Sequence, residues 1–220
     1  MKTFHELQEG VYDPNILKAF FLAGGPGSGK SYVVKRTTGG LGMKIVNSDI
    51  AFEKKLKDAG LSLDIRELDP EVRDEIRGQA KKITAKQKAN YLNGRLGLII
   101  DGTGKDYDKI AKQATELKQL GYDVHMIFVN TSLDTALERN AKRDRKVPES
   151  LVIKSWNDVQ KNIGKFSQYF RRNFIVVDNN DSEEDVMGPV FKQVRSLAMA
   201  KVQNPTGLKW IANELAMKRR

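Results

Sequence analysis

The sequence predicts an α/β protein built on a parallel sheet, and the order of its apolar segments carries that prediction. Short apolar runs alternate with longer amphipathic stretches, the pattern of strands joined by crossover helices. Glycine, asparagine or aspartate bounds each run, as expected at strand ends. The expected strands are residues 19–23, 43–47, 98–100, 124–129 and 174–177. A chain of 220 residues is long enough for such a domain to bury its own core.

Helical patterns lie between and after these strands. The expected helices are residues 30–37, 70–92, 106–120, 133–141, 148–163 and 183–201. Stop signals stand at Gly39-Gly40, Gly94 and Gly121, and candidate caps at Thr131-Ser132 and Asp181-Ser182. Residues 204–207 break the last helix, so we expect a main domain over 1–203 and a helical tail over 204–220. The tail carries a tryptophan and aliphatic residues at helical spacing, and it either packs back or binds a partner.

Composition excludes several classes of protein. Hydrophobic residues make up 40% and charged residues 30% of the chain, which favours a globular protein over a disordered or fibrous one. The chain has no cysteine, which excludes disulfides, thiolate metal sites and cysteine nucleophiles. Neither a signal-peptide core nor a membrane-spanning apolar run is present, so we expect a cytoplasmic protein that does not enter the membrane. A formal net charge of +10 favours anionic partners such as nucleic acid or nucleotides, although a solvated basic surface gives the same value.

A glycine-rich segment joins the first expected strand to the first helix. Residues 24–31 read GGPGSGKS and fill the pattern GxxxxGK[ST] in the required strand-to-helix context. Backbone N–H groups of such a loop surround a phosphate, the lysine reaches the β and γ phosphates, and the final hydroxyl binds Mg²⁺. The motif therefore predicts a P-loop NTPase fold with a five-stranded parallel sheet, using ATP and Mg²⁺. The expected nucleotide-binding residues here are Gly25, Pro26, Gly27, Ser28, Gly29, Lys30, Ser31 and Tyr32.

Two aspartates follow strands whose carboxyl ends meet at the same edge of a parallel sheet. Asp101 ends the run LIID, where a carboxylate completes a magnesium site together with Ser31, although an aspartate there is also often a cap or turn residue. Asp49 follows the second strand, where a carboxylate can accept the proton of an attacking hydroxyl. The alternative is that residues 47–49 only cap a helix that begins near Ile50.

Two basic segments suggest further contacts with phosphate. Residues 139–148 concentrate cations at a helix end, and a short basic lid is the functional interpretation, with a solvated helix end as the alternative. Arg139 and Arg143 are four apart, so that one guanidinium can stack near a base while the other holds phosphate. The second segment is a helical stripe that could follow a phosphate backbone or remain simply solvated. Candidate acceptor-binding residues are Arg73, Arg77 and Lys81 of that stripe and Arg145 of the lid.

These motifs together resemble the P-loop kinases that include zeta toxins and the kinase domain of bacteriophage polynucleotide 5′-kinase. The matching segments are GGPGSGKS at 24–31, VNSD at 46–49, IIDGT at 99–103, and ERNAKR at 138–143 followed by Val147-Pro148. The resemblance implies Asp49, Lys30 and Arg143 as catalytic residues. It also places Arg139 near adenine, Arg143 on the transferring phosphate, and the protein in a bacterial or phage-infected cell.

The acceptor and the oligomeric state stay open at this point. In polynucleotide kinases an arginine soon after the base aspartate contacts the acceptor, whereas here Ile50, Ala51 and Phe52 follow and the first cation is Lys54. We expect an ATP-dependent kinase acting on a hydroxyl of a nucleic acid or nucleotide, including a hydroxymethylated base in DNA. A sugar-nucleotide kinase of the zeta type and an ATPase that regulates a partner are the alternatives.

Overall fold

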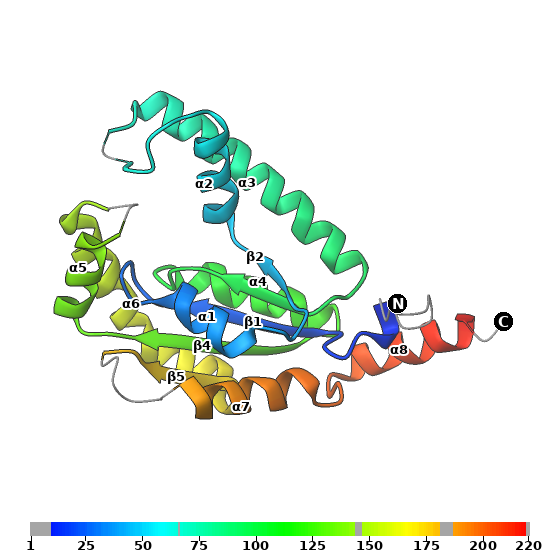
Figure 1. The fold of residues 1–220 in the computed structure, drawn as a ribbon. Coiled ribbons are helices and arrows are strands. Elements are labelled where there is room, and N and C mark those ends of the chain that lie inside the picture. The colour runs from blue at the N-terminus through cyan, green and yellow to red at the C-terminus, as the bar shows by residue number, and fades with distance from the viewer. Residues whose placement is uncertain (1–9, 66, 144–146, 181–186, 219–220) are drawn as a thin grey trace.

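The computed structural model describes residues 10–65, 67–143, 147–180 and 187–218. Five parallel strands form one sheet in the order β2-β3-β1-β4-β5, with helices on both faces (Figure 1). The strands are β1 (Lys18–Ala23), β2 (Lys44–Val46), β3 (Leu98–Asp101), β4 (Asp123–Asn130) and β5 (Phe174–Asp178). Each overlaps one of the apolar runs, so the predicted α/β fold with five parallel strands is confirmed.

The helices follow the predicted order with two differences. They are α1 (Lys30–Thr38), α2 (Ser48–Asp58), α3 (Pro70–Asn93), α4 (Tyr107–Gln119), α5 (Leu133–Ala141), α6 (Glu149–Phe170), α7 (Met187–Met199) and α8 (Pro205–Lys218), with 3-10 turns η2 (Gly10–Tyr12) and η3 (Arg171–Asn173). Helix α2 was foreseen only as the capping alternative, and α6 continues to Phe170 instead of ending at residue 163. The candidate cap Asp181-Ser182 lies outside the described residues.

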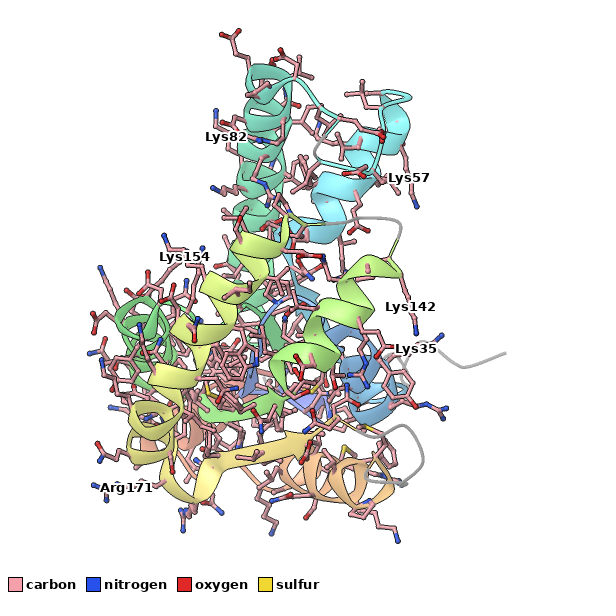
Figure 2. All side chains as sticks on the ribbon, turned by 90° about the vertical axis from the view of Figure 1, so that its left-hand side faces the viewer. Lys35, Lys57, Lys82, Lys142, Lys154 and Arg171 are labelled. Atoms are coloured by element: carbon pink, nitrogen blue, oxygen red, sulfur yellow. The ribbon has the colours of Figure 1, made fainter. Side chains whose placement is uncertain are left out.

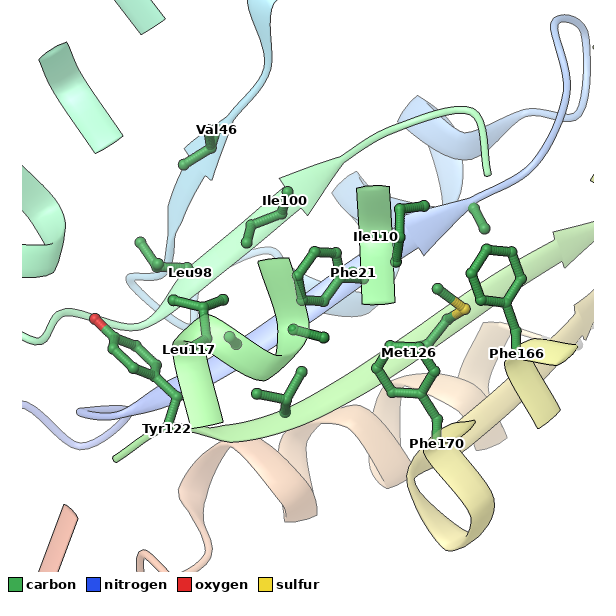
Figure 3. Close-up of a cluster of buried hydrophobic side chains, with 14 of the residues drawn as sticks. Phe21, Val46, Leu98, Ile100, Ile110, Leu117, Tyr122, Met126, Phe166 and Phe170 are labelled. Carbon is green, nitrogen blue, oxygen red and sulfur yellow. The ribbon is translucent and has the colours of Figure 1, made fainter. Parts of the chain in front are cut away.

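One face of the sheet is covered by α4 and α6 (Figure 3). Phe21 of β1 and Met126 of β4 are buried beneath Phe166 and Phe170 of α6. The extension of α6 beyond residue 163 follows from this packing, because both phenylalanines lie in the added turns and are buried in the core. The residues of α4 in this core are Ile110, Ala114 and Leu117.

The opposite face is covered by α1 and α7. Phe20 and Leu22 of β1 alternate with the residues that face α4 and α6, and they pack with Val33 of α1 and Val194 of α7. Because strands buried on both faces lack an exposed side, β1 reads as an unbroken apolar run after Lys18.

Helices α2 and α3 rise above the sheet as an arm with its own small core (Figure 1). Phe52 and Leu56 of α2 are fully buried against Ala80 of α3, and Leu68 of the connecting loop closes the cluster. Asp69 begins α3 as its N-cap, with the carboxylate accepting from the N–H groups of Glu71 and Val72. The outer part of the arm therefore has a core of its own, while the last turn of α3 packs Tyr91 and Leu92 against the sheet core.

The C-terminal tail packs back on the main domain. Helix α8 places Trp210 and Ile211 against the core beneath α4, and Gly207 lies so close to Gly121 that a side chain at either position would collide. The carboxylate of Asp123 accepts from the backbone N–H groups of residues 203 and 204 and pairs with the buried Lys18 at 2.7 Å. Of the two outcomes open from the sequence, the structure shows packing back.

In the described part of the chain, none of the helices combines the length and the apolar character required to cross a bilayer.

Candidate active site

The glycine-rich loop leaves β1 at the carboxyl edge of the sheet. Gly27 and Gly29 have φ of 78° and 82°, the left-handed region that favours glycine. A side chain at Gly27 would collide with the carbonyl oxygen of Ala136 in α5, so this position also needs a residue without Cβ. The N–H of Gly24 donates to the carbonyl of Thr103 at 2.9 Å, which ties the start of the loop to the residues after β3.

Lys30 begins α1 directly after the loop. Its Nζ donates to the carbonyl oxygens of Gly24 at 2.6 Å and Gly25 at 3.2 Å, so the ammonium lies across the loop. The N-cap of α1 is Gly29, which supplies no side-chain acceptor to the first turn. The N–H groups at this helix end, the positive end of the helix dipole and the ammonium together form an anion site of the kind the motif predicts.

Asp101 and Ser31 line one cavity of about 470 Å³ between α1, β2 and β3. Leu22, the penultimate residue of β1, pairs with Asp101 in the sheet, so the carboxylate stands beside the start of the loop. A hydroxyl and a carboxylate are hard oxygen donors that suit Mg²⁺, and phosphates and water supply the remaining ligands in such sites. These two residues therefore fit the metal. Among described residues, no group of three or more His, Cys, Asp or Glu side chains forms a separate metal site.

The carboxyl of Asp101 has a raised pKa. Burial is the largest cause, the nearby Lys30 ammonium opposes it, and the negative charge of Asp49 adds to it. Asn47 Nδ2 donates to Asp101 Oδ2 at 2.6 Å and fixes the orientation of the group. A carboxylate that is costly to ionise alone, beside a lysine and a phosphate loop, is suited to receive a divalent cation.

Asp49 lies in the first turn of α2, and its carboxylate does not serve as the helix cap. The cap is Asn47, whose Oδ1 accepts from the Asp49 N–H at 2.7 Å. The carboxylate of Asp49 pairs instead with Arg77 Nη1 of α3 at 3.0 Å, and the same guanidinium lies 4.3 Å from the ring centre of Phe52. The side chain of Asn47 thus connects the two aspartates: it caps the helix that carries Asp49 and holds Asp101.

Arg139 is brought beside the glycine-rich loop. Its Nη1 donates to the carbonyl of Asn179 at 2.7 Å and its Nη2 to that of Asn180 at 3.4 Å. Asn179 Nδ2 in turn donates to the carbonyl of Ser28 at 2.8 Å, which connects the end of β5 to the loop. The guanidinium is therefore held by backbone acceptors near Gly29 of the loop.

The remaining residues predicted to bind nucleotide or acceptor do not gather at one place in the structure. Arg143 is exposed just past the end of α5, while Arg145 lies outside the described residues. Tyr32 is half exposed, with the Arg36 guanidinium 5.4 Å from its ring centre. Arg73 pairs with its neighbour Asp74 at 2.9 Å, and Lys81 is exposed further along α3. Of the three predicted acceptor residues that the structure describes, Arg77 pairs with Asp49.

Three residues that support the site, each from outside the glycine-rich loop, could not be identified as such from the sequence. Asn179 gave no signal beyond a polar residue after a strand, and its bond to the loop depends on β5 lying beside β4. Trp156 donates from Nε1 to the carbonyl of Thr131 at 2.8 Å, and its backbone passes behind Gly25. Asn47 was considered only as a cap, although the same side chain also holds Asp101.

Comparison with known proteins places this geometry in a family. The sequence profile of the zeta toxin family matches residues 8–187, which is most of the chain. No curated protein matches the chain. Three similar solved structures share between 14% and 20% of their residues with this chain, so they support the fold alone.

Three solved structures illustrate that fold. A protein assigned as a kinase from Chloroflexus aurantiacus J-10-fl is 16% identical at a TM-score of 0.56, and the match covers 81% of this chain and 97% of that one. The AvrRxo1-ORF1:AvrRxo1-ORF2 complex with ATP is 14% identical at a TM-score of 0.62, covering 76% and 56%. The Pnkp1/Rnl/Hen1 RNA repair complex is 20% identical at a TM-score of 0.54, covering 69% and 47%. The chain thus spans about half of the matched chains in the last two.

The family profile spans the phosphate loop, both aspartates and Arg139, and the resemblance drawn from those motifs is confirmed. The chain belongs to the zeta toxin family and is an ATP-dependent P-loop kinase.

Proposed function

We propose that the protein transfers the γ-phosphoryl group of ATP, with Mg²⁺, to a hydroxyl of a nucleotide or nucleic acid. The observation that carries this proposal is the position of Asp49. Asn47 connects it to the phosphate-loop edge, because this one side chain accepts from the Asp49 N–H at 2.7 Å and donates to the Asp101 carboxylate at 2.6 Å. An ATPase that only regulates a partner needs the loop and Asp101 but has no use for a second carboxylate at the acceptor side.

The chemistry assigns one task to each residue. The acceptor oxygen attacks the γ phosphorus, its proton passes to the Asp49 carboxylate, and the bond from phosphorus to the bridging oxygen breaks as ADP leaves. Lys30 stabilises charge on the β and γ phosphates, and Arg143 does so on the transferring group. Ser31 and Asp101 would hold Mg²⁺, which supplies charge neutralisation on the phosphate oxygens when bound. Arg139, held by Asn179 and Asn180, offers a flat guanidinium to the base of ATP.

Arg77 supports an anionic acceptor. The arginine that follows the base aspartate in polynucleotide kinases is absent here, and α3 supplies a guanidinium to Asp49 from a different part of the chain. Stacking on Phe52 holds that guanidinium in place at 4.3 Å from the ring centre. Because the Arg77 side chain is about one third exposed, a phosphate on the acceptor can reach it beside the base.

A sugar nucleotide is the second candidate acceptor. The family match favours it, because the profile that covers residues 8–187 is that of the zeta toxins. Such a molecule also carries phosphates for Arg77 and a free hydroxyl for Asp49. The two acceptors differ in length, and an assay of ATP consumption against DNA, RNA, nucleosides and sugar nucleotides separates them.

The decisive test is Asp49→Asn. If Asp49 is the base, transfer to the best acceptor should fall by about 10² to 10⁴-fold, the usual contribution of a general base. ATP affinity should stay within a few-fold of the parent value, because the proton is accepted only when an acceptor is present. Turnover number, ATP affinity and melting temperature are measured on the same preparation.

The matched control is Asp58→Asn at the exposed end of the same helix, which removes one carboxylate far from the loop. It should behave as the parent. Unchanged transfer in Asp49→Asn would return this residue to a structural role in the first turn of α2 and overturn the proposal.

A further inference from the structure

The greater part of α3 is free of acidic residues. After Glu75, the sequence contains no aspartate or glutamate until Asp101, and the helix has five cations in this stretch. These cations are Arg77, Lys81, Lys82, Lys86 and Lys88. An exposed helix of a globular protein normally mixes both signs of charge, so this arm carries an unusually cationic surface close to Asp49.

The five cations lie on two different sides of the helix. Arg77, Lys81 and Lys88 are four and seven residues apart, which places them along one flank. Lys82 and Lys86 are four apart on another side, and Figure 2 shows Lys82 on the side of α3 turned away from α2. Since the helix rises about 1.5 Å per residue, the flank extends about 16 Å from Arg77 to Lys88.

The flank connects the candidate base to α4. At one end Arg77 pairs with Asp49, and at the other end Lys88 is half-buried near α4. Burial lowers the pKa of Lys88, the neighbouring Glu116 opposes this, and the positive charge of Lys109 adds to it. In the described ranges, no salt bridge involves Lys81, Lys88 or Lys109. The ammonium groups of Lys88 and Lys109 therefore lie within electrostatic range of one another, and the Glu116 carboxylate also lies within range of Lys88 without forming a salt bridge to it.

We propose that Arg77, Lys81 and Lys88 of α3, with Lys109 of α4, form a track that binds the phosphate backbone of a single-stranded polynucleotide. The proposal rests on the proposed function and names its acceptor class: the strand end at Arg77 offers its hydroxyl to Asp49, and the following phosphates lie toward α4. The track contains no aromatic residue, so it holds backbone phosphates without reading the bases.

The length of the cationic flank favours a polynucleotide over a small acceptor. Arg77 alone suffices to hold one phosphate beside Asp49, and a sugar nucleotide that binds there has no group left for cations about 16 Å away along the helix. A bilayer surface would engage the outer lysines as well, whereas the track uses only one flank. A polynucleotide accounts for both the position of the cations and their continuity with the base.

The test compares two double variants of one helix with equal loss of charge. Lys81→Gln/Lys88→Gln removes two cations of the track, and Lys82→Gln/Lys86→Gln removes two from another side of α3. The probe is a fluorescein-labelled oligothymidylate long enough to span the track, and its Kd is measured by anisotropy over a range of salt concentrations. No ATP is added, so the result does not depend on whether transfer occurs.

The track variant should bind the strand about tenfold more weakly or worse. The slope of log K against log salt should shrink by about 1.4, because two phosphate contacts are lost at about 0.7 each. The control variant should stay within about twofold in Kd and keep a slope near that of the parent. Lys81→Arg/Lys88→Arg should restore binding, which separates lost charge from lost packing around Lys88. Circular dichroism and melting temperature establish that all variants fold.

Three results would overturn the proposal. The first is that the parent protein does not bind the oligothymidylate. The second is that both double variants weaken binding equally, which indicates only general attraction to a basic protein. The third is that the track variant loses binding to phosphatidylserine vesicles while its affinity for the oligothymidylate is unchanged, which indicates a membrane surface. Failure of the proposed function has a different signature. In that case Asp49→Asn leaves transfer intact, whereas the strand measurements still report on the track by themselves.

Discussion

The loop at residues 24–31 and the arm formed by α2 and α3 meet at the same edge of the sheet, yet they are held in different ways. The loop is fixed by contacts that begin at the end of β1 and involve Thr103, Ala136 and Asn179 around it. The arm has a separate small core around Phe52 and an ion pair between Asp49 and Arg77, and it reaches the sheet core through Tyr91 and Leu92 at the end of α3. The loop is embedded in the sheet layers, whereas the arm stands beside them.

Because the loop and the arm are held differently, we expect the ATP site to be rigid and the proposed acceptor site to be more easily deformed. A site for ATP that is built into the sheet is preorganised, since its backbone cannot shift without disturbing the cores on both faces. The outer part of the arm, formed by α2 and the first half of α3, can move at a lower cost in free energy, because its buried residues belong to the separate core around Phe52. We therefore expect changes in the loop to affect chemistry at constant stability, and changes in the arm to affect acceptor use through local stability.

The largest expected effect is on the loop side. Lys30→Ala removes an ammonium that lies across the phosphate loop, so kcat should fall by about 10³-fold, or about 4 kcal/mol of transition-state stabilisation. The melting temperature should change little, because the two described hydrogen bonds of the ammonium go to carbonyls of the loop and the residue is only partly buried. Kinetics with the best acceptor and a thermal melt measure both quantities.

Lys35→Ala is the matched control for this prediction. Lys35 belongs to the same helix, one turn after Ser31, and its side chain is exposed (Figure 2). It should retain activity close to that of the parent. If both variants lost the same activity, the effect would belong to the charge of α1 in general and not to the loop lysine.

The arm gives the second prediction. Phe52→Ala empties a fully buried position in the core of the arm and removes the ring on which Arg77 rests. Burial of that size predicts a cost of about 3 kcal/mol. Amide hydrogen exchange should accelerate in α2 and in the first half of α3, while the strands keep their protection and ATP affinity is retained.

Phe21→Ala tests the other region with the same change of side chain. Phe21 is buried in β1 beneath α6, so its loss should lower the stability of the whole sheet and the melting temperature of the protein. Equal acceleration of exchange throughout the molecule in both variants would show that the arm and the sheet unfold as one unit.

The same contrast explains what the sequence could reveal. The strands and the loop were predictable because apolar periodicity and the glycine spacing are local signals, and Asp101 could be placed because it ends a strand. The pairing of Asp49 with Arg77 was not predictable, because it joins residues of two helices that are 28 positions apart in the sequence. Helix α2 was foreseen only as the capping alternative, because residues 47–49 fit both a helix cap and a catalytic carboxylate after a strand.

The smallest predicted effect is the change in melting temperature caused by Asp101→Asn. Asp101 lies where the loop region meets α2, since Asn47 donates to it. Burial and the charge of Asp49 raise the pKa of Asp101 in the folded protein, against an opposing effect of Lys30. The native state therefore binds this proton more tightly than the unfolded chain. The contribution of the group to stability falls as pH rises from its ordinary pKa through the raised one, and the penalty is fully present at neutral pH.

An asparagine carries no charge to bury and can still accept from Asn47 through its amide oxygen. At pH 7 the variant should melt about 1–2 °C higher than the parent, which corresponds to less than about 1 kcal/mol for a chain of this length. The difference should shrink as pH falls toward 4, because the parent then becomes neutral at this position as well. Metal-dependent affinity for ATP should decline at the same time, since a carboxylate ligand is lost. Melting curves at several pH values provide the check, and a variant less stable than the parent at pH 7 would mean that Lys30 and Asn47 stabilise the ionised carboxylate by more than its burial costs.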